Sequence, residues 1–528
     1  MGMAVYLGLD ASTQSLTATL IEAGPGRHEV LFDYSLVYDR DLPRYGTSHG
    51  VIRGDDPSVV VAPALMWVDA LDQVMARLTA ERPRDMARLT AISGSAQQHG
   101  SVYLTKAGVA RLEMVDPRTP LALQMAAAFS RPMSPVWMDS STDVECGEIE
   151  DAVGGAGRLA AHTGARAFER FTGPQVRAFA KRDPQAYAAT DRIHLISSFM
   201  PSLLAGAEAP IDHGDGSGMN LMELSTGTWW DEAVRVTAPD LAARLPRLQP
   251  SWTVVGPLAP YWQERYGLPA AKVIAWSGDN PCSLIGSGLV REGRLAISLG
   301  TSDTVIGLMT ELRIHEGGIG YVSASPTGDY MGTTVFKNGS LARERVRDDY
   351  GFDWAAFSAA LASRPPGNHG AMMLPWFDPE ITPHVAVPGV RRIDLDPADA
   401  PANVRAVVEG QMMAMANHTR WMGGDAAVIY ATGGAAGNRQ VLQVMADVFG
   451  AEVVRSRAGN SAALGAALRA WHADARASGQ PVDWDAIVAP FTAPDPAWRF
   501  RPSADAAAVY AELRRRYARA EAHALEPV

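Results

Sequence analysis

Residues 5–21, VYLGLDASTQSLTATLI, decide the fold that we expect for this chain. Val5–Leu9 and Leu16–Ile21 are mainly apolar runs, the second rich in β-branched residues, and they predict two strands. Between them, Asp10–Ser15 forms a turn of small, acidic and hydroxyl residues. The segment therefore predicts a hairpin whose tip presents a carboxylate and several hydroxyl groups. Taken alone, such a tip is most often an ordinary polar turn.

The same pattern returns in the second half of the chain. Leu295–Leu299 and Thr304–Leu308 predict two strands, and Gly300–Asp303 between them is again a turn of small, hydroxyl and acidic residues. One such hairpin says little about function, whereas a pair with one copy opening each half indicates a duplicated fold. A nucleotide bound between the two copies is the function that this duplication favours.

A third segment places an acidic residue at the end of a strand. The apolar run Lys272–Trp276 predicts a strand that stops at Gly278, and Pro281 is well placed in the first turn of a following helix. Asp279 therefore lies at a strand's carboxyl end beside a glycine that lets a ligand approach, which suits a general base. The same position also suits a helix N-cap, a role that Asp fills readily.

Two further segments contain polar residues that could face a ligand. Leu89–Ser93 predicts a buried strand, and the loop that follows it contains Gln97, Gln98 and His99 before Gly100. Alone, His99 would more often be a structural histidine. Arg170 lies in a mostly helical stretch from residue 147 to about 204, where a lone arginine is usually a solvated charge.

The last third of the chain combines a strand, a glycine-rich turn and a helix. Val428–Ala431 predicts the strand, Thr432–Asn438 the turn, and a face formed by Val441, Leu442, Met445, Val448 and Phe449 the helix. Glycines admit close approach of a nucleotide to the backbone, although a plain strand-to-helix turn has the same pattern. Asn460–Ala467 predicts a small-residue helix start against which another element can pack closely, and the segment from Asp505 a peripheral helix.

Composition bounds the class of protein. The chain has 528 residues, of which 47% are hydrophobic and 20% charged, enough for large cores and two or more domains. A formal net charge of −11 argues against nucleic acid as the main partner. The two cysteines, Cys146 and Cys282, imply no disulfide framework, and we expect no signal peptide and no membrane span. These features predict a cytoplasmic protein.

Several common catalytic motifs are absent from the sequence. Each lysine is followed by a residue other than Ser or Thr, which excludes a Walker A loop. The chain has no His-Arg-Asp loop, no Asp-Phe-Gly triplet and no GxGxxG, HExxH or CxxC pattern. Gly46–Gly50 matches the letters of GxSxG, but the poor strand pattern before it predicts a loop rather than a nucleophile elbow.

Taken together, the segments resemble the FGGY carbohydrate kinases, and among them the xylulokinases, especially animal-type members. The resemblance extends from about residue 4 to residue 475, and it is specific because many motifs follow one another in the family's order. One departure is Phe168, which replaces the family's usual tyrosine. The motifs are Gly8–Gln14, Gln97–Gly100, Val136–Thr142, Arg166–Gly173, Asp215–Leu221, Gly278–Pro281, Ser298–Thr304, Phe336–Leu341 and Ala431–Gly434 with Asn438.

The resemblance implies an α/β fold of two actin-like (ribonuclease H-like) domains that flank a deep catalytic cleft. Residues 1–255 would form the N-terminal, sugar-binding FGGY domain. Residues 256–528 would form the C-terminal, ATP-binding FGGY domain with a helical C-terminal extension. The cofactors implied are ATP and Mg²⁺, and the protein would act as a monomer or homodimer without nucleic acid or membrane.

The resemblance also implies roles for particular residues. Asp279 would be the general base, and the sugar would be bound by His99, Arg170, Asp279 and Asn280. The metal would be held near Asp10 and Asp279. The residues that match nucleotide contacts of the family are Asp10, Ser12, Thr13, Gly300, Thr301, Trp354, Gly433, Gly434 and Asn438.

The implied reaction is ATP-dependent phosphorylation of D-xylulose at its C5 hydroxyl, giving D-xylulose 5-phosphate. Another sugar or polyol kinase of the same family, acting on ribulose, gluconate or glycerol, stays open as an alternative. A nucleotide-switching ATPase with the actin-like fold but no sugar substrate is a second alternative, which the segment around Asp279 and Asn280 disfavours.

Overall fold

The computed structural model describes residues 3–24, 26–315, 318–455 and 459–526 and divides into two compact units. The first unit comprises Met1–Gly288, Ser323–Asp329 and Ala458–Thr492, and the second Leu289–Val322, Tyr330–Arg457 and Ala493–Val528. The units differ from the expected division at residue 255. Strand β16 (Lys272–Ile274) pairs with β6 (Leu89–Ala96) inside the first unit, so the chain leaves that unit only after residue 288.

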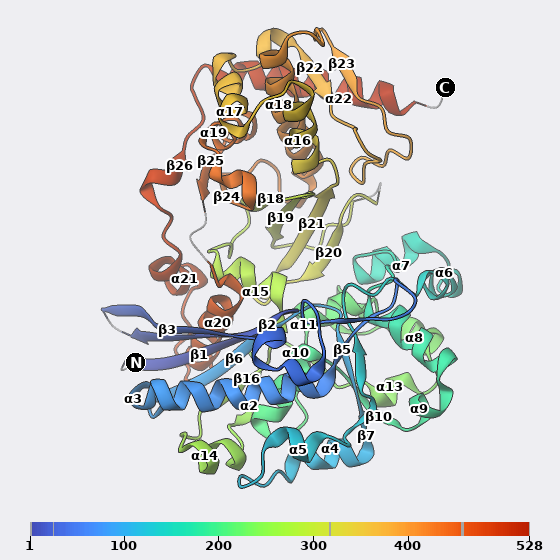
Figure 1. Cartoon of the computed structure of the whole chain (residues 1–528), viewed down its shortest axis with the longest axis vertical. Coiled ribbons are helices and arrows are strands. Elements are labelled where there is room, and N and C mark those ends of the chain that lie inside the picture. The colour runs from blue at the N-terminus through green and yellow to red at the C-terminus, as the bar shows by residue number, and fades with distance from the viewer. Residues whose placement is uncertain (1–2, 25, 316–317, 456–458, 527–528) are drawn as a thin grey trace. The chain divides into compact units, whose positions relative to one another are not determined.

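A seven-stranded mixed sheet forms the centre of the first unit (Figure 1). Its strand order is β15-β16-β6-β1-β2-β3, with β17 also paired to β6. The first three strands form an antiparallel meander, whereas β6 runs parallel to β1, β16 and β17. The other strands of this sheet are β1 (Ala4–Ala11), β2 (Ser15–Gly24), β3 (Arg27–Val37), β15 (Val254–Pro257) and β17 (Ser277–Gly278).

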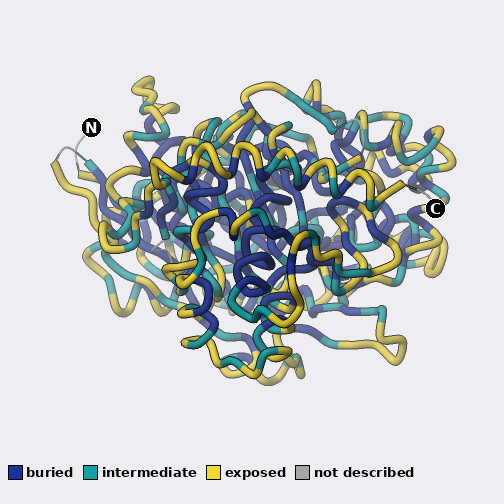
Figure 2. The backbone as a smooth tube through the Cα atoms, turned by 90° about the horizontal axis from the view of Figure 1, so that it is seen from above, coloured by how far each residue is buried: buried dark blue, intermediate teal, exposed yellow. Residues whose placement is uncertain are grey.

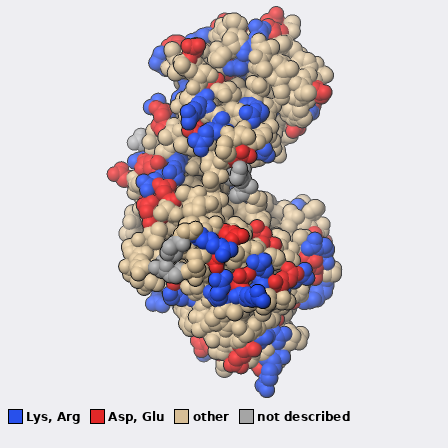
Figure 3. Space-filling model, turned by 90° about the vertical axis from the view of Figure 1, so that its left-hand side faces the viewer, with Lys and Arg blue, Asp and Glu red and all other residues tan. Residues whose placement is uncertain are grey.

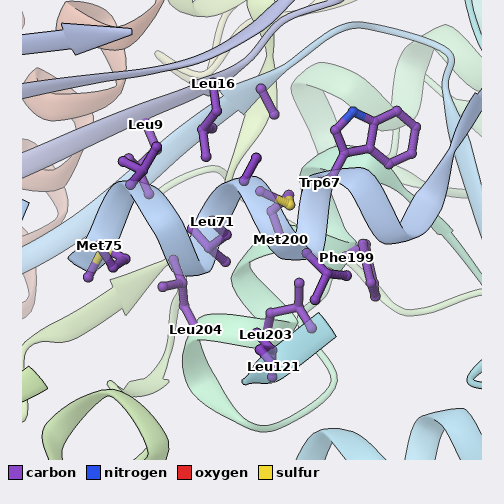
Figure 4. Packing of buried hydrophobic residues seen from close by; sticks show 14 of the residues in the cluster. Leu9, Leu16, Trp67, Leu71, Met75, Leu121, Phe199, Met200, Leu203 and Leu204 are labelled. Carbon is purple, nitrogen blue, oxygen red and sulfur yellow. The ribbon is translucent and has the colours of Figure 1, made fainter. Parts of the chain in front are cut away.

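Helices pack on both faces of this sheet. Leu7 and Leu9 of β1 belong to the core that contains α2 (Ala64–Glu81) and α10 (Ile196–Ala205), as Figure 4 shows around Trp67 and Leu71. Successive side chains of a strand point to opposite faces, so Gly8 faces the other way, where the helix α20 (Ser461–Ala477) lies against it. Trp67, Leu71 and Leu78 of α2 are buried in that core.

The close packing predicted for the small-residue segment is also confirmed. A Cβ atom at Gly8, Gly286 or Gly465 would lie less than 3.0 Å from backbone atoms of a neighbouring element. Gly286 is the last residue of α15 (Asp279–Gly286), and Gly465 of α20 meets that helix. Backbones therefore meet without intervening side chains where α20 packs against β1 and α15.

The remaining elements of the first unit surround this sheet. Their helices are α1 (Tyr38–Asp41), α3 (Pro83–Met86), α4 (Lys106–Glu113), α5 (Leu121–Met125), α6 (Asp143–Ala152), α7 (Ala156–Thr163), α8 (Thr172–Arg182), α9 (Pro184–Ala188), α11 (His213–Gly216), α12 (Asp231–Thr237), α13 (Leu241–Arg244), α14 (Pro260–Tyr266) and α21 (Trp484–Thr492). Their strands are β4 (Ile52–Arg53), β5 (Val60–Pro63), β7 (Ser101–Thr105), β8 (Phe129–Arg131), β9 (Met133–Pro135), β10 (Thr190–Leu195), β11 (Ile211–Asp212), β12 (Met222–Glu223), β13 (Thr228–Trp229) and β14 (Leu248–Gln249).

The second unit repeats the sheet topology of the first. Its strand order is β20-β21-β19-β18-β24-β25-β26, with antiparallel pairs from β21 to β18, parallel pairs from β18 to β25, and an antiparallel strand at the end. This is the pattern of β3-β2-β1-β6-β16-β15, so the predicted duplication is confirmed. The strands are β18 (Arg294–Leu299), β19 (Asp303–Met309), β20 (Tyr321–Ala324), β21 (Tyr330–Phe336), β24 (Val428–Thr432), β25 (Glu452–Arg455) and β26 (Arg499–Phe500).

The C-terminal helix differs from its expected peripheral role. One face of α22 (Ala506–Leu525) buries Tyr510, Leu513 and Tyr517 in the core of the second unit. The periodic apolar face predicted after residue 438 is confirmed as the buried face of α19 (Arg439–Phe449). Other elements of this unit are α16 (Ser340–Asp349), α17 (Trp354–Ser363), α18 (Ala400–His418), β22 (Met372–Leu374) and β23 (Arg391–Ile393).

The motif Val136–Thr142 lies in a loop that follows β9, which ends at Pro135. The carboxylate of Asp139 accepts hydrogen bonds from Val60 N, Ser141 N and Gln175 Nε2. Those bonds close a loop instead of extending the strand. Gly46–Gly50 lies outside regular strands and helices, as expected for a chance match to GxSxG.

The surface carries charged side chains of both signs. Figure 2 shows that exposed residues concentrate in loops and turns, and Figure 3 shows basic and acidic side chains interspersed over one face. Within the described ranges, no helix has both the length and the apolar character needed to cross a membrane.

Candidate active site

Three parallel strands of the first unit end at one edge of its sheet. Asp10 of β1 pairs with Ser95 of β6, and Ser277 of β17 pairs with the same Ser95 from the other side. Carboxyl ends of neighbouring parallel strands meet at one edge, where open α/β sheets bind ligands. The strand register therefore brings Asp10 and the residue after β17, Asp279, to the same edge.

Asp10 is a buried carboxylate held by hydroxyl groups. Its Oδ1 accepts a hydrogen bond from Ser95 Oγ at 2.6 Å, and its Oδ2 accepts one from Ser12 Oγ. Burial raises the pKa of Asp10, and the two hydroxyl donors oppose that rise. In the same turn Thr13 Oγ1 accepts a hydrogen bond from the indole Nε1 of Trp137 at 2.8 Å. The predicted turn residues are thus fixed by side chains from outside the hairpin.

Asp279 begins α15 but does not cap it. The N-cap is Gly278, and no side chain makes a capping hydrogen bond there; Asp279 Oδ1 accepts the neighbouring Asn280 N–H at 2.8 Å. The N-cap interpretation of Asp279 is therefore wrong for this carboxylate. Burial, and secondly the charge of Asp10, raise the pKa of Asp279 to about 7. A carboxyl group with that pKa can accept a proton near neutral pH.

A cavity of about 380 Å³ lies in front of these carboxylates. The charged side chains that line it are Asp10 and Asp279, and its other polar groups are neutral. The lining residues are Asp10, Ser12, Ser15, Thr17, Ser35, Asp279, Asn280, Ser283 and Gly459 to Ala463. Two unneutralised carboxylates in a hydroxyl-lined cavity fit a hydrated divalent cation, because Mg²⁺ uses few carboxylates together with waters and phosphate oxygens. Within the described residues no cluster of three or more acidic, His or Cys ligands occurs.

His99 lies in the loop after β6 and is kept neutral. Its ring Nδ1 lies 3.0 Å from Gly218 O, and its backbone has a φ of 70°. Burial, and secondly the charge of Arg170, lower the pKa of His99 to about 3. A neutral ring beside a carbonyl must donate from Nδ1, so Nε2 is the acceptor nitrogen. His99 can therefore accept a hydrogen bond from a ligand hydroxyl.

Arg170 is held by aromatic rings instead of by carboxylates. Its guanidinium carbon lies 5.0 Å from the ring centroid of Phe168 and 5.6 Å from that of Phe171. The ring of Phe171 also packs against His99 at 4.7 Å between centroids. Cation–π contacts use the faces of the guanidinium group, so its in-plane N–H donors stay available to a ligand.

Asn280 connects the two groups of predicted sugar residues. Its Nδ2 donates to Gln98 Oε1 at 2.9 Å, and Gln98 directly precedes His99. His99 and Arg170 do not line the cavity of Asp10 and Asp279, so Gln98 is the structural link between the two regions. The sequence analysis quoted Gln98 as part of a polar loop but assigned it no role.

Asp215 is a second residue that the sequence analysis missed. Its side chain is 1% exposed, and its Oδ2 accepts from Ser197 Oγ at 2.6 Å. A Cβ atom at Gly278 would meet Asp215 Oδ1 and the side chain of Gln98, which places all three together below Asp279. Asp215 opens the motif Asp215–Leu221, which was the sign in the sequence that this residue matters. The spacing of that motif does not indicate that Asp215 lies near Asp279.

In the second unit, neighbouring residues hold the turn that contains Gly300 and Thr301 in place. The turn between β18 and β19 contains Gly300 and Thr301, and Gly300 O accepts from Ser340 N at 2.8 Å. At its end Asp303 forms a bidentate, fully buried ion pair with Arg343, at 2.9 and 3.0 Å. Gly433 packs so closely on β18 that a Cβ there would meet the backbone of Leu299.

A cavity of about 820 Å³ lies beside this turn, within the second unit. Trp354 and Gly434 line it, as do Ser340, Arg343, Glu344 and Ser358. Asn438 also lines it, but its Oδ1 caps α19 through Gln440 N and its Nδ2 donates to Ser358 Oγ at 2.7 Å. Trp354, Gly434 and Asn438 are thus brought together as predicted, whereas Gly300, Thr301 and Gly433 do not line this cavity.

Two family models match the chain. Residues 131–286 match the N-terminal domain and residues 295–473 the C-terminal domain of the FGGY family of carbohydrate kinases. Among curated proteins, the chain is 40% identical to rat xylulose kinase over 531 residues, covering 98% of this chain and 97% of the rat protein. It is 33% identical to D-xylulose kinase A of Aspergillus niger, covering 90% of each.

Solved structures share the fold at low identity. Xylulose kinase from Rhodospirillum rubrum superposes with a TM-score of 0.79 at 19% identity, covering 98% of each chain. Plasmodium falciparum glycerol kinase with ADP superposes with a TM-score of 0.76 at 15% identity, covering 100% of this chain and 99% of that one. The predicted fold class of two α/β domains is therefore confirmed.

Proposed function

Because the chain belongs to the FGGY family of carbohydrate kinases, we propose that it transfers the γ-phosphoryl group of ATP to the C5 hydroxyl of D-xylulose. The product would be D-xylulose 5-phosphate. The choice of sugar rests on the names of relatives that are 40% identical along nearly the whole chain. The chemistry rests on one observation, the carboxylate of Asp279 with a pKa near 7 beside Asp10 at the cavity.

The first unit would bind the sugar. The neutral His99 would accept a hydrogen bond from one hydroxyl through Nε2, and the in-plane donors of Arg170 would bind oxygen atoms of the same sugar. Asn280 Nδ2 is occupied by Gln98, so the side-chain oxygen of Asn280 would accept from a further hydroxyl. A site that bonds particular hydroxyl groups strongly rejects analogues without them.

Asp279 would act as the general base. It takes the proton of the C5 hydroxyl as that oxygen forms a bond to the γ-phosphorus, while the bond from phosphorus to the ADP oxygen breaks. Phosphoryl transfer depends mainly on positioning and on stabilisation of charge. The bond from Asn280 N to Asp279 Oδ1 holds the carboxylate at the start of α15, aimed at the cavity.

We also propose that Asp10 and Asp279 hold Mg²⁺, in part through water. When bound, Mg²⁺ would neutralise negative charge on the phosphates. The cavity itself supplies two carboxylates and neutral hydroxyl groups, which is the donor set that such an ion needs. Ser12 and Ser95 hold Asp10 in a fixed orientation for this role.

The second unit would bind the nucleotide. Trp354 would stack on the adenine, and Gly434 would let the adenosine approach the backbone, with Gly433 and Asn438 shaping the turn. The backbone N–H groups around Gly300 and Thr301, and those of Ser12 and Thr13 in the first unit, would bind phosphates. Asn438 would contribute indirectly, because its side chain caps α19 and donates a hydrogen bond to Ser358.

The substrate is tested by product analysis. Purified protein with MgATP is offered D-xylulose, ribulose, gluconate and glycerol in parallel, with ADP release and phosphorylated product both measured. We expect D-xylulose to give the highest kcat/KM and a phosphate at C5. A higher value with another sugar would replace D-xylulose by that substrate, and ADP release without a phosphosugar would support the ATPase alternative.

We further propose that the enzyme acts in the cytoplasm. We also propose that it is a monomer or a homodimer, and light scattering at several protein concentrations would test this oligomeric state.

The contribution of His99 to sugar binding should not depend on pH over the range where an ordinary histidine titrates. The pKa of His99 is lowered to about 3, so the ring stays neutral from pH 8 down to about pH 5. Because Asp279 titrates near pH 7 in the same site, the measurement is made on the Asp279→Asn variant, for which we expect the calorimetric Kd for D-xylulose, without nucleotide, to change less than about twofold over that range. A tenfold loss of affinity per pH unit below about 6.5 would show that a protonated His99 interferes with binding.

The lowered pKa of His99 also determines how the stability of the folded protein depends on pH. The folded pKa of His99 is lower than its unfolded pKa of about 6.5, so below that pH the unfolded chain binds the extra proton. His99 therefore contributes stability above about pH 6.5 and progressively less as the pH falls toward 3. The sugar titration is accordingly made well above the acid unfolding transition.

Truncation of the sugar residues should separate the two substrates. We expect His99→Ala and Arg170→Ala each to raise the KM for D-xylulose by about 10-fold or more, since each removes a buried hydrogen bond to the sugar. The KM for MgATP should stay within about twofold, because both side chains lie in the first unit. Arg166→Ala is the matched control, since Arg166 stacks on the same Phe168 ring but is exposed. Equal changes in both KM values would contradict the assignment.

A further inference from the structure

Trp354, which the family resemblance assigns to nucleotide binding, lines the 820 Å³ cavity of the second unit. It is 45% exposed and begins α17, where Asp353 caps the helix through Ala356 N. Its only ring neighbour along α17 is Phe357, which meets it edge-on at 5.4 Å and 72°. An exposed indole on a helix end has several rotamers, so something must hold it for it to stack on a base.

Arg347 supplies that support. Its guanidinium carbon lies 4.5 Å from the centroid of the Trp354 ring, over the face of the indole. Its Nε donates to Asp348 Oδ1 at 2.7 Å, which fixes the guanidinium plane. Its carbonyl accepts from Phe352 N at 3.0 Å, so the same residue also ties the end of α16 to the segment that leads into α17.

The two faces of the indole are therefore inequivalent. Along one stripe of α16, Ser340, Arg343 and Glu344 line the cavity, and Arg347 follows one turn later. Arg347 itself does not line the cavity, whereas Trp354 does. Arg347 therefore contacts the Trp354 ring without itself lining the cavity, so the guanidinium covers one face of the indole and leaves the other uncovered by it.

We propose that Arg347 is a positioning residue for nucleotide binding. It holds the indole of Trp354 by a cation–π stack, so that the free face receives a purine base, a ligand class with a π-face suited to stacking. Stacking on an aromatic ring does not depend on which base is bound, because every base has a π-face. A guanidinium on the other face of the ring holds the indole without forming any contact to the nucleotide. This inference rests on the proposed function, in which the second unit binds the nucleotide.

The test is a double-mutant cycle on ADP affinity, measured by calorimetry on the full-length protein with Arg347→Ala, Trp354→Ala and the double variant. We expect Arg347→Ala to weaken ADP binding by about two- to fivefold, in line with an exposed cation–π contact. Trp354→Ala should weaken it by about fivefold or more, in line with loss of a base stack. In the Trp354→Ala background, Arg347→Ala should have no further effect.

Three controls separate positioning from a merely structural role. Arg345→Ala changes an arginine of the same helix that is 69% exposed and pairs with Asp349, and it should leave ADP affinity unchanged. Arg347→Lys should restore part of the lost affinity, and the kcat at saturating ATP and the KM for sugar should not move in any Arg347 variant. An equal loss of affinity from Arg347→Ala with and without Trp354, or no loss at all, would overturn the proposal.

The outcome also distinguishes this inference from the proposed function. If Trp354→Ala leaves ADP affinity unchanged while D-xylulose is still phosphorylated, the positioning role of Arg347 is wrong and the kinase assignment stands. If none of the tested sugars is phosphorylated but the cycle shows coupling in ADP binding, the kinase assignment fails and the nucleotide site stands.

Discussion

Replacement of Asp279 by Asn should remove most turnover while both substrates still bind. Asn has the same shape and can still accept the hydrogen bond from Asn280 N, but it cannot take the proton of the sugar hydroxyl. A general base contributes about 10²- to 10⁴-fold in rate, so kcat should fall by that factor. Calorimetry should find the Kd for D-xylulose changed only a few-fold and that for ADP unchanged, and steady-state assays give the kcat.

Stability measurements distinguish this loss from misfolding. The folded pKa of Asp279 is raised to about 7 from an unfolded value of about 4, so the stability that this group contributes is lost as the pH rises from about 4 to about 7. Asp279→Asn removes the buried charge, and its Tm at pH 8 should therefore equal or exceed that of the parent protein. An ordinary inactive, damaged variant would show a lower Tm.

Asp231→Asn is the matched control for Asp279→Asn. Asp231 also occupies the first residue of a helix, α12, in the same unit, so both variants remove an acidic group from a helix N-terminus. Asp231→Asn should leave kcat unchanged. Near-parental turnover in Asp279→Asn, or an equal loss in both variants, would show that Asp279 is not the base.

Local pattern was sufficient to predict that Asp10 and Asp279 each follow an apolar strand, whereas only the family resemblance implied that the two carboxylates lie together. The strand order that brings the carboxyl ends of β1 and β17 to one edge was not predicted from the sequence. The cavity shared by Asp10, Asp279 and Asn280 agrees with what the resemblance implied. The roles of these residues in catalysis and binding stay predictions.

Long-range partners could not be predicted in the same way. Asp215 and Gln98, which are 117 positions apart in the sequence, both lie next to Gly278, and buried polar side chains have no periodicity that reveals such a partner. The return of residues 461–477 to the first unit as α20 is likewise a tertiary event, and it explains why a division at residue 255 does not describe the units. Around Trp137 the chain's path is likewise set by long-range hydrogen bonds, which Val60 N and Gln175 Nε2 donate to Asp139.

A methyl group added at Gly8 should strongly destabilise the folded protein. The Cβ of Gly8→Ala would lie less than 3.0 Å from the carbonyl oxygen of Ala463 and from the backbone nitrogen of Ala467, both in α20. Backbone atoms of a buried helix cannot rotate away as a side chain can. Overpacking typically costs about 1–3 kcal/mol, and two backbone collisions place Gly8→Ala at or above the upper end.

The destabilisation should reach the active site, because Gly8 and Asp10 share one strand and α20 also packs on α15, which begins with Asp279. Denaturant unfolding measures the change, with Gly147→Ala as control: Gly147 lies in the exposed middle of α6, where an added Cβ meets nothing within 4 Å. Gly147→Ala should stabilise the protein by about 0.4–1 kcal/mol, because alanine restricts the unfolded chain. Opposite signs for the same chemical change would locate the cost in the β1–α20 contact. A Gly8→Ala variant as stable as the parent would mean that α20 does not pack against β1 as closely as the structure has it.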